Sequence, residues 1–185
     1  MTRLIIFDFD GTIGNTRQNI VDTFHLTMRE RGLELRSDDE CASTIGLTLH
    51  QSFLSLYPSM SDAEAEECVA HYRRIFYDNI EELTPLLFDG VKEALARLHA
   101  MDLKLTIASS RSSPSLLLFL KNMGISQYFS YVIGADNVPH HKPHPEPVLQ
   151  TLRECGFEPS DALVVGDMPV DMLMARNASV RCVGV

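Results

Sequence analysis

The sequence lacks any pair of cysteines at the spacing of a metal or redox motif. Its four cysteines are scattered through 185 residues, at Cys41, Cys68, Cys155 and Cys182, and no two form a CxxC pair. Structural zinc sites depend on such closely spaced ligands, so a zinc site of this kind is not expected. Reduced, buried thiols are the expected state of these side chains.

Long apolar runs and basic runs are also missing. No stretch approaches the roughly 18 apolar residues of a membrane span, and the N-terminal apolar run stops at Asp8, before the length of a signal peptide. The net charge of −9 at pH 7, with no basic run, argues against electrostatic binding to nucleic acid. We therefore expect a cytoplasmic protein without a nucleic-acid or membrane partner; the oligomeric state is not predicted.

Short apolar runs alternate with helical patterns along most of the chain. The runs cover residues 4–7, 103–108, 131–133, 162–165 and 180–185, and their length and β-branched content predict buried parallel strands. Between two of them, Pro114 suits a first helical turn, with Ser113 as its cap and Gly124 at its exit. Strands that alternate with helices predict the α/β class, with a doubly wound, Rossmann-like parallel sheet.

Residues 15–83 break this alternation, because they contain no convincing strand. One helical pattern there ends at Gly32, and a second begins with a predicted capping box from Ser61 to Glu64. The apolar positions of the two patterns are Ile20, Phe24, Met28, Cys68, Tyr72, Phe76 and Ile80. We expect a small α-helical domain at residues 15–83, inserted into a core of residues 1–14 and 84–185.

Polar residues follow four of the predicted strands. In an open parallel sheet, ligands bind beyond the carboxyl ends of the strands, so these residues are expected to meet at one edge. Asp8 and Asp10, two positions apart, would face the same cleft, and Gly11 permits a tight turn after them. Asp167 adds a third acid, and Mg²⁺ is the hard cation that such carboxylates hold together with a phosphate. Lys142 would supply positive charge opposite.

The stretches DFDGT, Ser109–Ser110, HKPHPEP around Lys142, and GDMPVD resemble the four motifs of the haloacid dehalogenase superfamily, in that family's order. The resemblance covers essentially the whole chain. The inserted helical segment resembles the small C1-type cap of phosphoglycolate phosphatase-like members. The fold implied is a Rossmann-like core with a helical cap domain.

The resemblance implies that Asp8 is the nucleophile that forms an aspartyl-phosphate. Asp10 would protonate the leaving group and then help to activate water. The Asp8 carboxylate, the Asp10 backbone carbonyl and Asp167 would hold Mg²⁺, with Asp171 as an orienting group or a water-mediated ligand.

The same resemblance gives Ser109 and the Ser110 amide the role of binding the phosphoryl group, while Lys142 neutralises its charge. Ile45, Gly46 and Leu47 resemble the substrate-facing loop of the cap. The implied substrate is a small phosphorylated metabolite, and the implied activity is phosphoglycolate phosphatase-like hydrolysis of a phosphomonoester.

Other functions remain open on the sequence alone. A β-phosphoglucomutase-like phosphotransferase and a pyrophosphatase share these motifs, and a non-catalytic metabolite-binding member is a further alternative. A receiver-like signalling domain is disfavoured, because it carries its Asp after a later strand and lacks the helical insert. A phosphonatase would lack an Asp matching Asp10, and a dehalogenase needs no Mg²⁺.

Structural interpretations stand beside these functional ones. Asp-Gly is common where a strand meets a turn, serines cap helices, Lys142 suits a solvated loop, and Asp171 suits a helix start. His140, His141 and His144 raise the alternative of a transition-metal site, which the oxygen-rich edge and three nearby prolines disfavour.

The chain departs from the family pattern at several positions. Asn15–Thr16 stands where relatives often have Asp-Ser, Met168 where Thr or Ser is frequent, and Arg111 where Lys or Asn is common. Relatives usually continue beyond the last strand, so the chain is expected to be shortened at its C-terminus.

Overall fold

The computed structural model describes residues 2–185, which fall into two compact units. The first unit runs to Asn15 and resumes at Leu86, and the second comprises Thr16–Pro85. The first unit is therefore built from two separate stretches of sequence. No helix in the described residues is both long enough and apolar enough to cross a bilayer.

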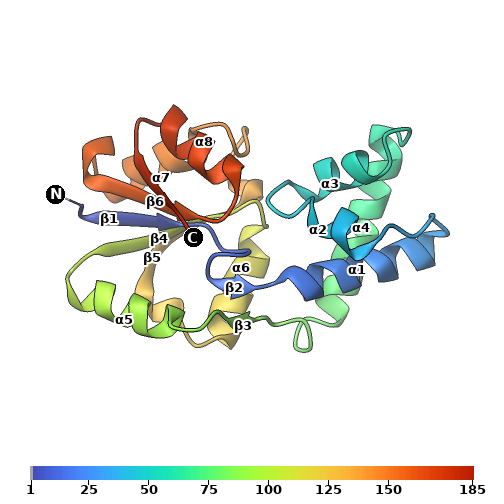
Figure 1. The fold of residues 1–185 in the computed structure, drawn as a ribbon, viewed down its shortest axis with the longest axis horizontal. Helices are drawn as coiled ribbons and strands as arrows, with labels where there is room; N and C mark the ends of the chain where they lie inside the picture. Colours follow the sequence, from blue (N-terminus) through green and yellow to red (C-terminus); the bar gives the residue numbers. More distant parts are fainter. Residues whose placement is uncertain (1) are drawn as a thin grey trace. The chain divides into compact units, whose positions relative to one another are not determined.

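A five-stranded parallel sheet forms the centre of the first unit (Figure 1). Its strands are β1 (Leu4–Phe7), β4 (Lys104–Ala108), β5 (Phe129–Ile133), β6 (Ala162–Gly166) and β7 (Arg181–Gly184). The order is β5-β4-β1-β6-β7, so the first strand of the chain lies in the middle. The α/β class and the parallel sheet predicted from the apolar runs are confirmed.

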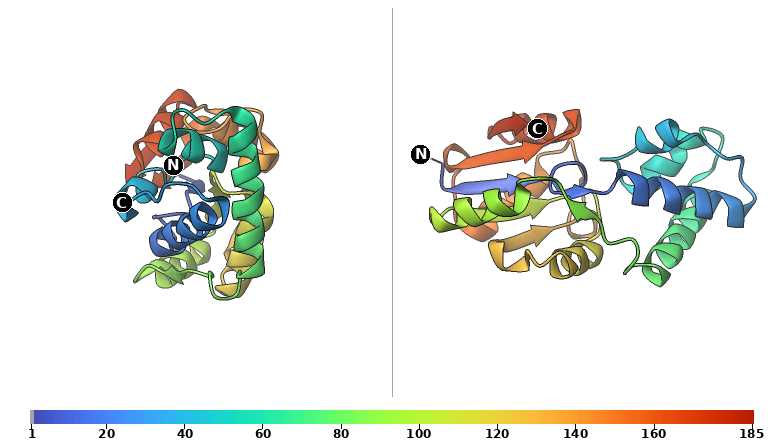
Figure 2. Two further views of the ribbon diagram at one scale, coloured as in Figure 1. Left: turned by 90° about the vertical axis from the view of Figure 1, so that its right-hand side faces the viewer. Right: turned by 60° about the horizontal axis from the view of Figure 1, so that its bottom comes forward.

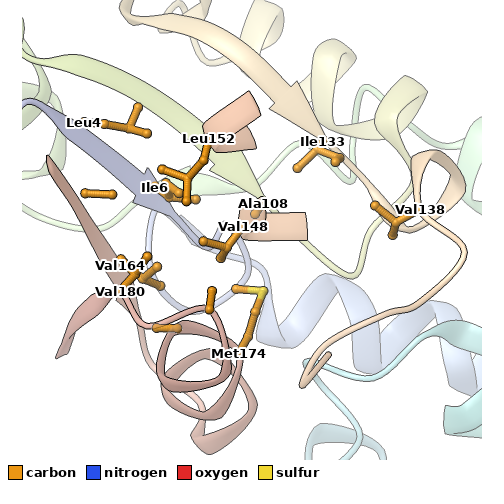
Figure 3. Packing of buried hydrophobic residues seen from close by; sticks show 13 residues of the cluster. Leu4, Ile6, Ala108, Ile133, Val138, Val148, Leu152, Val164, Met174 and Val180 are labelled. Atoms are coloured by element: carbon orange, nitrogen blue, oxygen red, sulfur yellow. The ribbon is translucent and has the colours of Figure 1, made fainter. Parts of the chain in front are cut away.

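Helices cover both faces of this sheet, with α7 and α8 on one face and α5 and α6 on the other (Figure 1). Their bounds are α5 (Val91–Ala100), α6 (Ser113–Asn122), α7 (Glu146–Cys155) and α8 (Pro169–Asn177). Under α7 and α8, Ile6 and Val164 of the sheet pack with Val148 and Met174 of the helices (Figure 3). Burial of each such side chain contributes about 1.5–3 kcal/mol, which fixes the strands whose ends carry the site.

Short elements complete the first unit. The two-residue strands β2 (Gly14–Asn15) and β3 (Leu86–Leu87) pair antiparallel where the chain leaves and re-enters it. Single 3₁₀ turns occupy Ser126–Tyr128, Ala135–Asn137 and Pro159–Asp161. The sequence analysis did not foresee β2 or β3, because two-residue strands have no readable alternation.

The second unit is helical, with α1 (Arg17–Arg31), α2 (Asp38–Ala42), α3 (Leu49–Leu56) and α4 (Asp62–Asp78). Helix α4 packs against α1 (Figure 2). Phe24 lies at the centre of this packing, with its ring centroid 5.2 Å from that of Phe53 and 5.0 Å from that of Tyr72. The capping box from Ser61 to Glu64 is confirmed, as is the helix end at Gly32.

Two details of the helix predictions are wrong. Helix α6 begins at Ser113 and its N-cap is Ser112, one residue before the predicted cap. Helix α4 ends at Asp78, so Ile80 lies half-buried in the turn that follows and does not continue the apolar face. Both errors concern helix ends, where local hydrogen bonds decide the boundary.

Candidate active site

Asp8 directly follows β1 and is held by the neighbouring strand. Its backbone N–H donates to the carbonyl of Val165 over 2.8 Å, which continues the sheet pairing beyond the last strand residue. The ammonium of Lys142 donates to Asp8 Oδ1 over 2.5 Å and to Asp171 Oδ1 over 2.6 Å. All three residues are buried, so one lysine bridges two carboxylates that water does not reach.

Burial dominates the electrostatics of this trio. It raises the pKa of Asp8 to about 7; the charges of Asp171 and Asp10 add to the rise, and Lys142 opposes it. For Lys142, burial acts to lower the pKa, but the attraction of Asp8 and Asp171 outweighs it and the pKa is raised. The lysine therefore stays charged, and it is the group that keeps a carboxylate at position 8 tolerable in the interior.

Asp167 reaches the same place from the end of β6. Burial raises its pKa, while a hydrogen bond from Thr12 Oγ1 to Asp167 Oδ1, 3.1 Å long, opposes the rise. Gly11 lies against this carboxylate with a φ of +85°. A Cβ at Gly11 would lie 2.2 Å from Asp167 Oδ2. Only glycine suits this position, because both the conformation and the space exclude a side chain.

Three acids converge closely enough to share one ion. Oxygen atoms of Asp8, Asp167 and Asp171 lie within 4.8 Å of one another, and among residues 2–185 no other group of three such ligands is so close. Asp171 is already engaged, since its Oδ1 accepts from Lys142 and its Oδ2 from the backbone N–H of Met168 over 3.1 Å. Asp8 and Asp167 are therefore the better candidate ligands, and Asp171 orients Lys142.

The charges of the site also fit a divalent cation. Its ionisable side chains are Asp8, Asp10, Asp167, Asp171, Lys142 and Arg111. Four carboxylates against two cations leave two negative charges in excess when all are ionised. Oxygen donors with this excess suit Mg²⁺, which uses one or two carboxylates together with waters and substrate phosphate. The Met168 departure costs little here, since the backbone makes the contact.

Asp10 is held by a partner that the motifs did not single out. Arg111 donates from Nη2 to Asp10 Oδ1 over 2.7 Å and from Nε to Asp10 Oδ2 over 3.3 Å. The guanidinium carbon lies 5.0 Å from the centroid of the Phe119 ring. This two-point pairing fixes the plane of the Asp10 carboxylate.

The two serines follow β4 at the same end of the sheet. Ser109 is buried; its backbone N–H donates to the carbonyl of Ile133 over 3.1 Å, and its Oγ accepts from the backbone N–H of Arg111 over 3.2 Å. Ser110 is half-buried beside it. The structure thus brings both serines to the sheet end that carries Asp8.

The predicted cap loop belongs to the second unit. Ile45, Gly46 and Leu47 are half-buried in the turn between α2 and α3, and their role towards substrate stays a prediction. His140 and His144 are exposed with ring centroids 4.5 Å apart.

Thr12 and Arg111 are the site residues that sequence reasoning missed. Thr12 belongs to DFDGT, and its place two residues after Asp10 was the available signal. Arg111 was noted only as a departure from the family pattern, because nothing in the sequence pairs it with Asp10, 101 residues away.

Comparison with known proteins places this geometry in a family. The model for haloacid dehalogenase-like hydrolases matches residues 5–185. The chain belongs to that family. The resemblance drawn from the four motifs is confirmed, and the protein is an enzyme of the phosphatase-like hydrolase type.

Individual relatives span the haloacid dehalogenase-like family's phosphatases. The chain is 34% identical to the probable phosphatase IndB of Dickeya dadantii (strain 3937), covering 100% of this chain and 81% of IndB. It is 29% identical to the pyrophosphatase PpaX of Bacillus cereus (strain AH820), covering 98% and 82%. A crystal structure from Bacteroides fragilis, described as a haloacid dehalogenase-like hydrolase, superposes with a TM-score of 0.94 at 28% identity, covering 100% and 87%.

Proposed function

We propose that this enzyme hydrolyses a small phosphomonoester with the help of Mg²⁺, as a phosphoglycolate phosphatase-like hydrolase that passes through an aspartyl-phosphate. The observation that carries the proposal is the buried contact of Lys142 with Asp8, beside Asp167 and Asp171. A bound Mg²⁺ ion would supply charge neutralisation between the carboxylates and the phosphate. Asp8 and Asp167 would hold it.

Asp8 and Asp10 divide the chemistry between them. An Asp8 oxygen attacks phosphorus, the bond from phosphorus to the leaving oxygen breaks, and Asp10 gives that oxygen a proton. Water then attacks the phosphorus of the aspartyl-phosphate. Asp10 accepts the water proton, and the bond from phosphorus to the Asp8 oxygen breaks, which regenerates the carboxylate and releases phosphate.

Lys142, Ser109 and Ser110 support both steps. In phosphoryl transfer, most of the catalytic effect comes from positioning and charge stabilisation. Lys142 touches the nucleophile directly, so its charge offsets the negative charge that Asp8 and the phosphoryl group bring together. Ser109 lies buried next to the same strand end and offers its hydroxyl to a phosphoryl oxygen.

The test is phosphate release from phosphoglycolate, sugar phosphates and nucleotides, with Mg²⁺ and with EDTA. We expect Mg²⁺-dependent release that disappears in Asp8→Asn. Asp89→Asn, at an exposed position, serves as the matched control with wild-type activity. Equal release by wild-type protein and Asp8→Asn would refute Asp8 as the nucleophile.

Pyrophosphate hydrolysis is the second candidate, favoured by the 29% identity to PpaX over 98% of the chain. Pyrophosphate therefore belongs in the same panel, and preferential release from it would select this candidate. Conversion of β-glucose 1-phosphate into an isomer, without free phosphate, would select a phosphotransferase instead.

A further inference from the structure

Arg111 is a second buried cation next to the reacting groups. Its side chain and that of Asp10 are each only 12% exposed, and their ion pair measures 2.7 Å between Nη2 and Oδ1. Its stem and guanidinium lie along Phe119, with the cation over the ring. These contacts hold the guanidinium at a fixed place, although Arg111 belongs to none of the four motif positions.

The position of Arg111 follows from the role of Asp10. A general acid must lie within hydrogen-bond reach of the oxygen it protonates, so the Arg111 guanidinium comes within about 6 Å of the leaving oxygen. Lys142 is held between Asp8 and Asp171, on the nucleophile. Arg111 is thus the cation beside the leaving group, whereas Lys142 is the cation beside the nucleophile.

We propose that Arg111 selects substrates whose leaving group carries a second negative charge, a carboxylate or a phosphate close to the leaving oxygen. The inference rests on the function proposed above. A guanidinium has five N–H donors in a planar fork that matches both anions, so Arg111 contacts the second anion while it remains beside Asp10. The second charge then meets a cation in a site that otherwise carries excess negative charge.

A purely orienting role for Arg111 makes a different prediction. If the guanidinium only fixes the Asp10 carboxylate, its loss slows every substrate by the same factor. If it also binds the second anion, its loss penalises anionic leaving groups beyond that common factor. The ratio of kcat/KM values between an anionic and a neutral leaving group separates the two roles.

The experiment uses phosphoglycolate, pyrophosphate and 2-hydroxyethyl phosphate, the last being the neutral counterpart of phosphoglycolate. Each is measured with wild-type protein, Arg111→Met, Arg111→Lys and the exposed control Arg97→Met. Hydrogen bonds to charged groups of this kind are typically worth a roughly 10- to 100-fold change in binding. We expect a loss of that size in the ratio of at least one anionic substrate to 2-hydroxyethyl phosphate in Arg111→Met.

Arg111→Lys is expected to lie between wild type and Arg111→Met, because it keeps the charge and loses the fork. Which ratio falls more tells a carboxylate from a phosphate. Ratios that stay at the wild-type value in Arg111→Met, or that fall equally in Arg97→Met, overturn the inference and leave the proposed function standing. Absence of hydrolysis of all three substrates by wild-type protein overturns the proposed function, and this inference with it.

Discussion

Lys142 Nζ lies 2.5 Å from Asp8 Oδ1, although 134 residues separate the two in sequence. The pair forms because β1 and the loop before α7 end at the same edge of the sheet. Asp171 completes the arrangement on the other side of the ammonium at 2.6 Å. Removal of the lysine would leave two buried carboxylates facing each other without a counter-charge.

Lys142→Met is therefore expected to destabilise the metal-free protein by about 3–5 kcal/mol, the usual cost of an uncompensated buried charge. Urea unfolding in EDTA at pH 8 measures this. Lys121→Met, at an exposed helix position, is the control and should change stability little. A loss no larger than that of the control would mean that Lys142 is not needed to hold the carboxylates.

The stability of the metal-free protein is expected to depend on pH through Asp8. Its pKa is about 7 in the folded protein against an ordinary 3.8, so folding disfavours the ionised form. Below pH 4 the group costs nothing; the cost grows as pH rises through this range and levels off above pH 7, at a few kcal/mol on the order of magnitude set by the shift.

Asp8→Asn removes that titration. The melting temperature of Asp8→Asn minus that of wild type, measured in EDTA, should increase between pH 4 and pH 7. Mg²⁺ should reduce the difference at pH 8, because it stabilises the wild-type carboxylate. A difference that stays flat or shrinks across this range would contradict the burial argument.

Gly11→Ala is expected to weaken Mg²⁺ binding by displacing Asp167, since the added Cβ would lie 2.2 Å from Oδ2. Gly156→Ala is a matched control, with a φ of +73° and nothing within 4 Å of the added Cβ. Both changes introduce backbone strain of roughly 1–2 kcal/mol, but only the first should raise the Mg²⁺ concentration for half-maximal activity. Equal Mg²⁺ requirements in both variants would dissociate Gly11 from the metal site.

Thr12→Val removes the hydroxyl that donates to Asp167 Oδ1 and keeps the shape of the side chain. Loss of such an orienting contact typically costs 10–100-fold in metal affinity, so we expect a rise of about 10-fold in the Mg²⁺ requirement. Thr12→Ser should restore it. Calorimetric Mg²⁺ titration checks both variants, and a Val variant with unchanged affinity would show that the contact is dispensable.

The sequence was informative where the physics is local or repetitive. The apolar runs located every strand of the five-stranded sheet, since a buried parallel strand needs a short continuous apolar stretch. The site motifs brought Asp8, Lys142 and Asp167 to one edge through a general property of parallel sheets. These predictions needed no knowledge of which strand lies beside which.

Pairings between distant side chains were beyond the sequence. The contact of Arg111 with Asp10 depends on the adjacency of β1 and β4, and the contact of Thr12 with Asp167 on that of β1 and β6. Helix ends were also misjudged, as at Ser112, because neighbouring serines compete for the cap. Both failures concern choices among nearly equivalent residues that tertiary structure decides.

The central place of β1 has a consequence for biosynthesis. Leu4 pairs with Lys104 on one side and with Ala162 on the other, so the first strand to leave the ribosome waits for partners made much later. Until β6 emerges, one edge of this apolar strand has no neighbour, and such long-range pairing is slow to form. The nascent chain thus depends on protection from aggregation, by chaperones or by its own early helices, until nearly all of it has been translated.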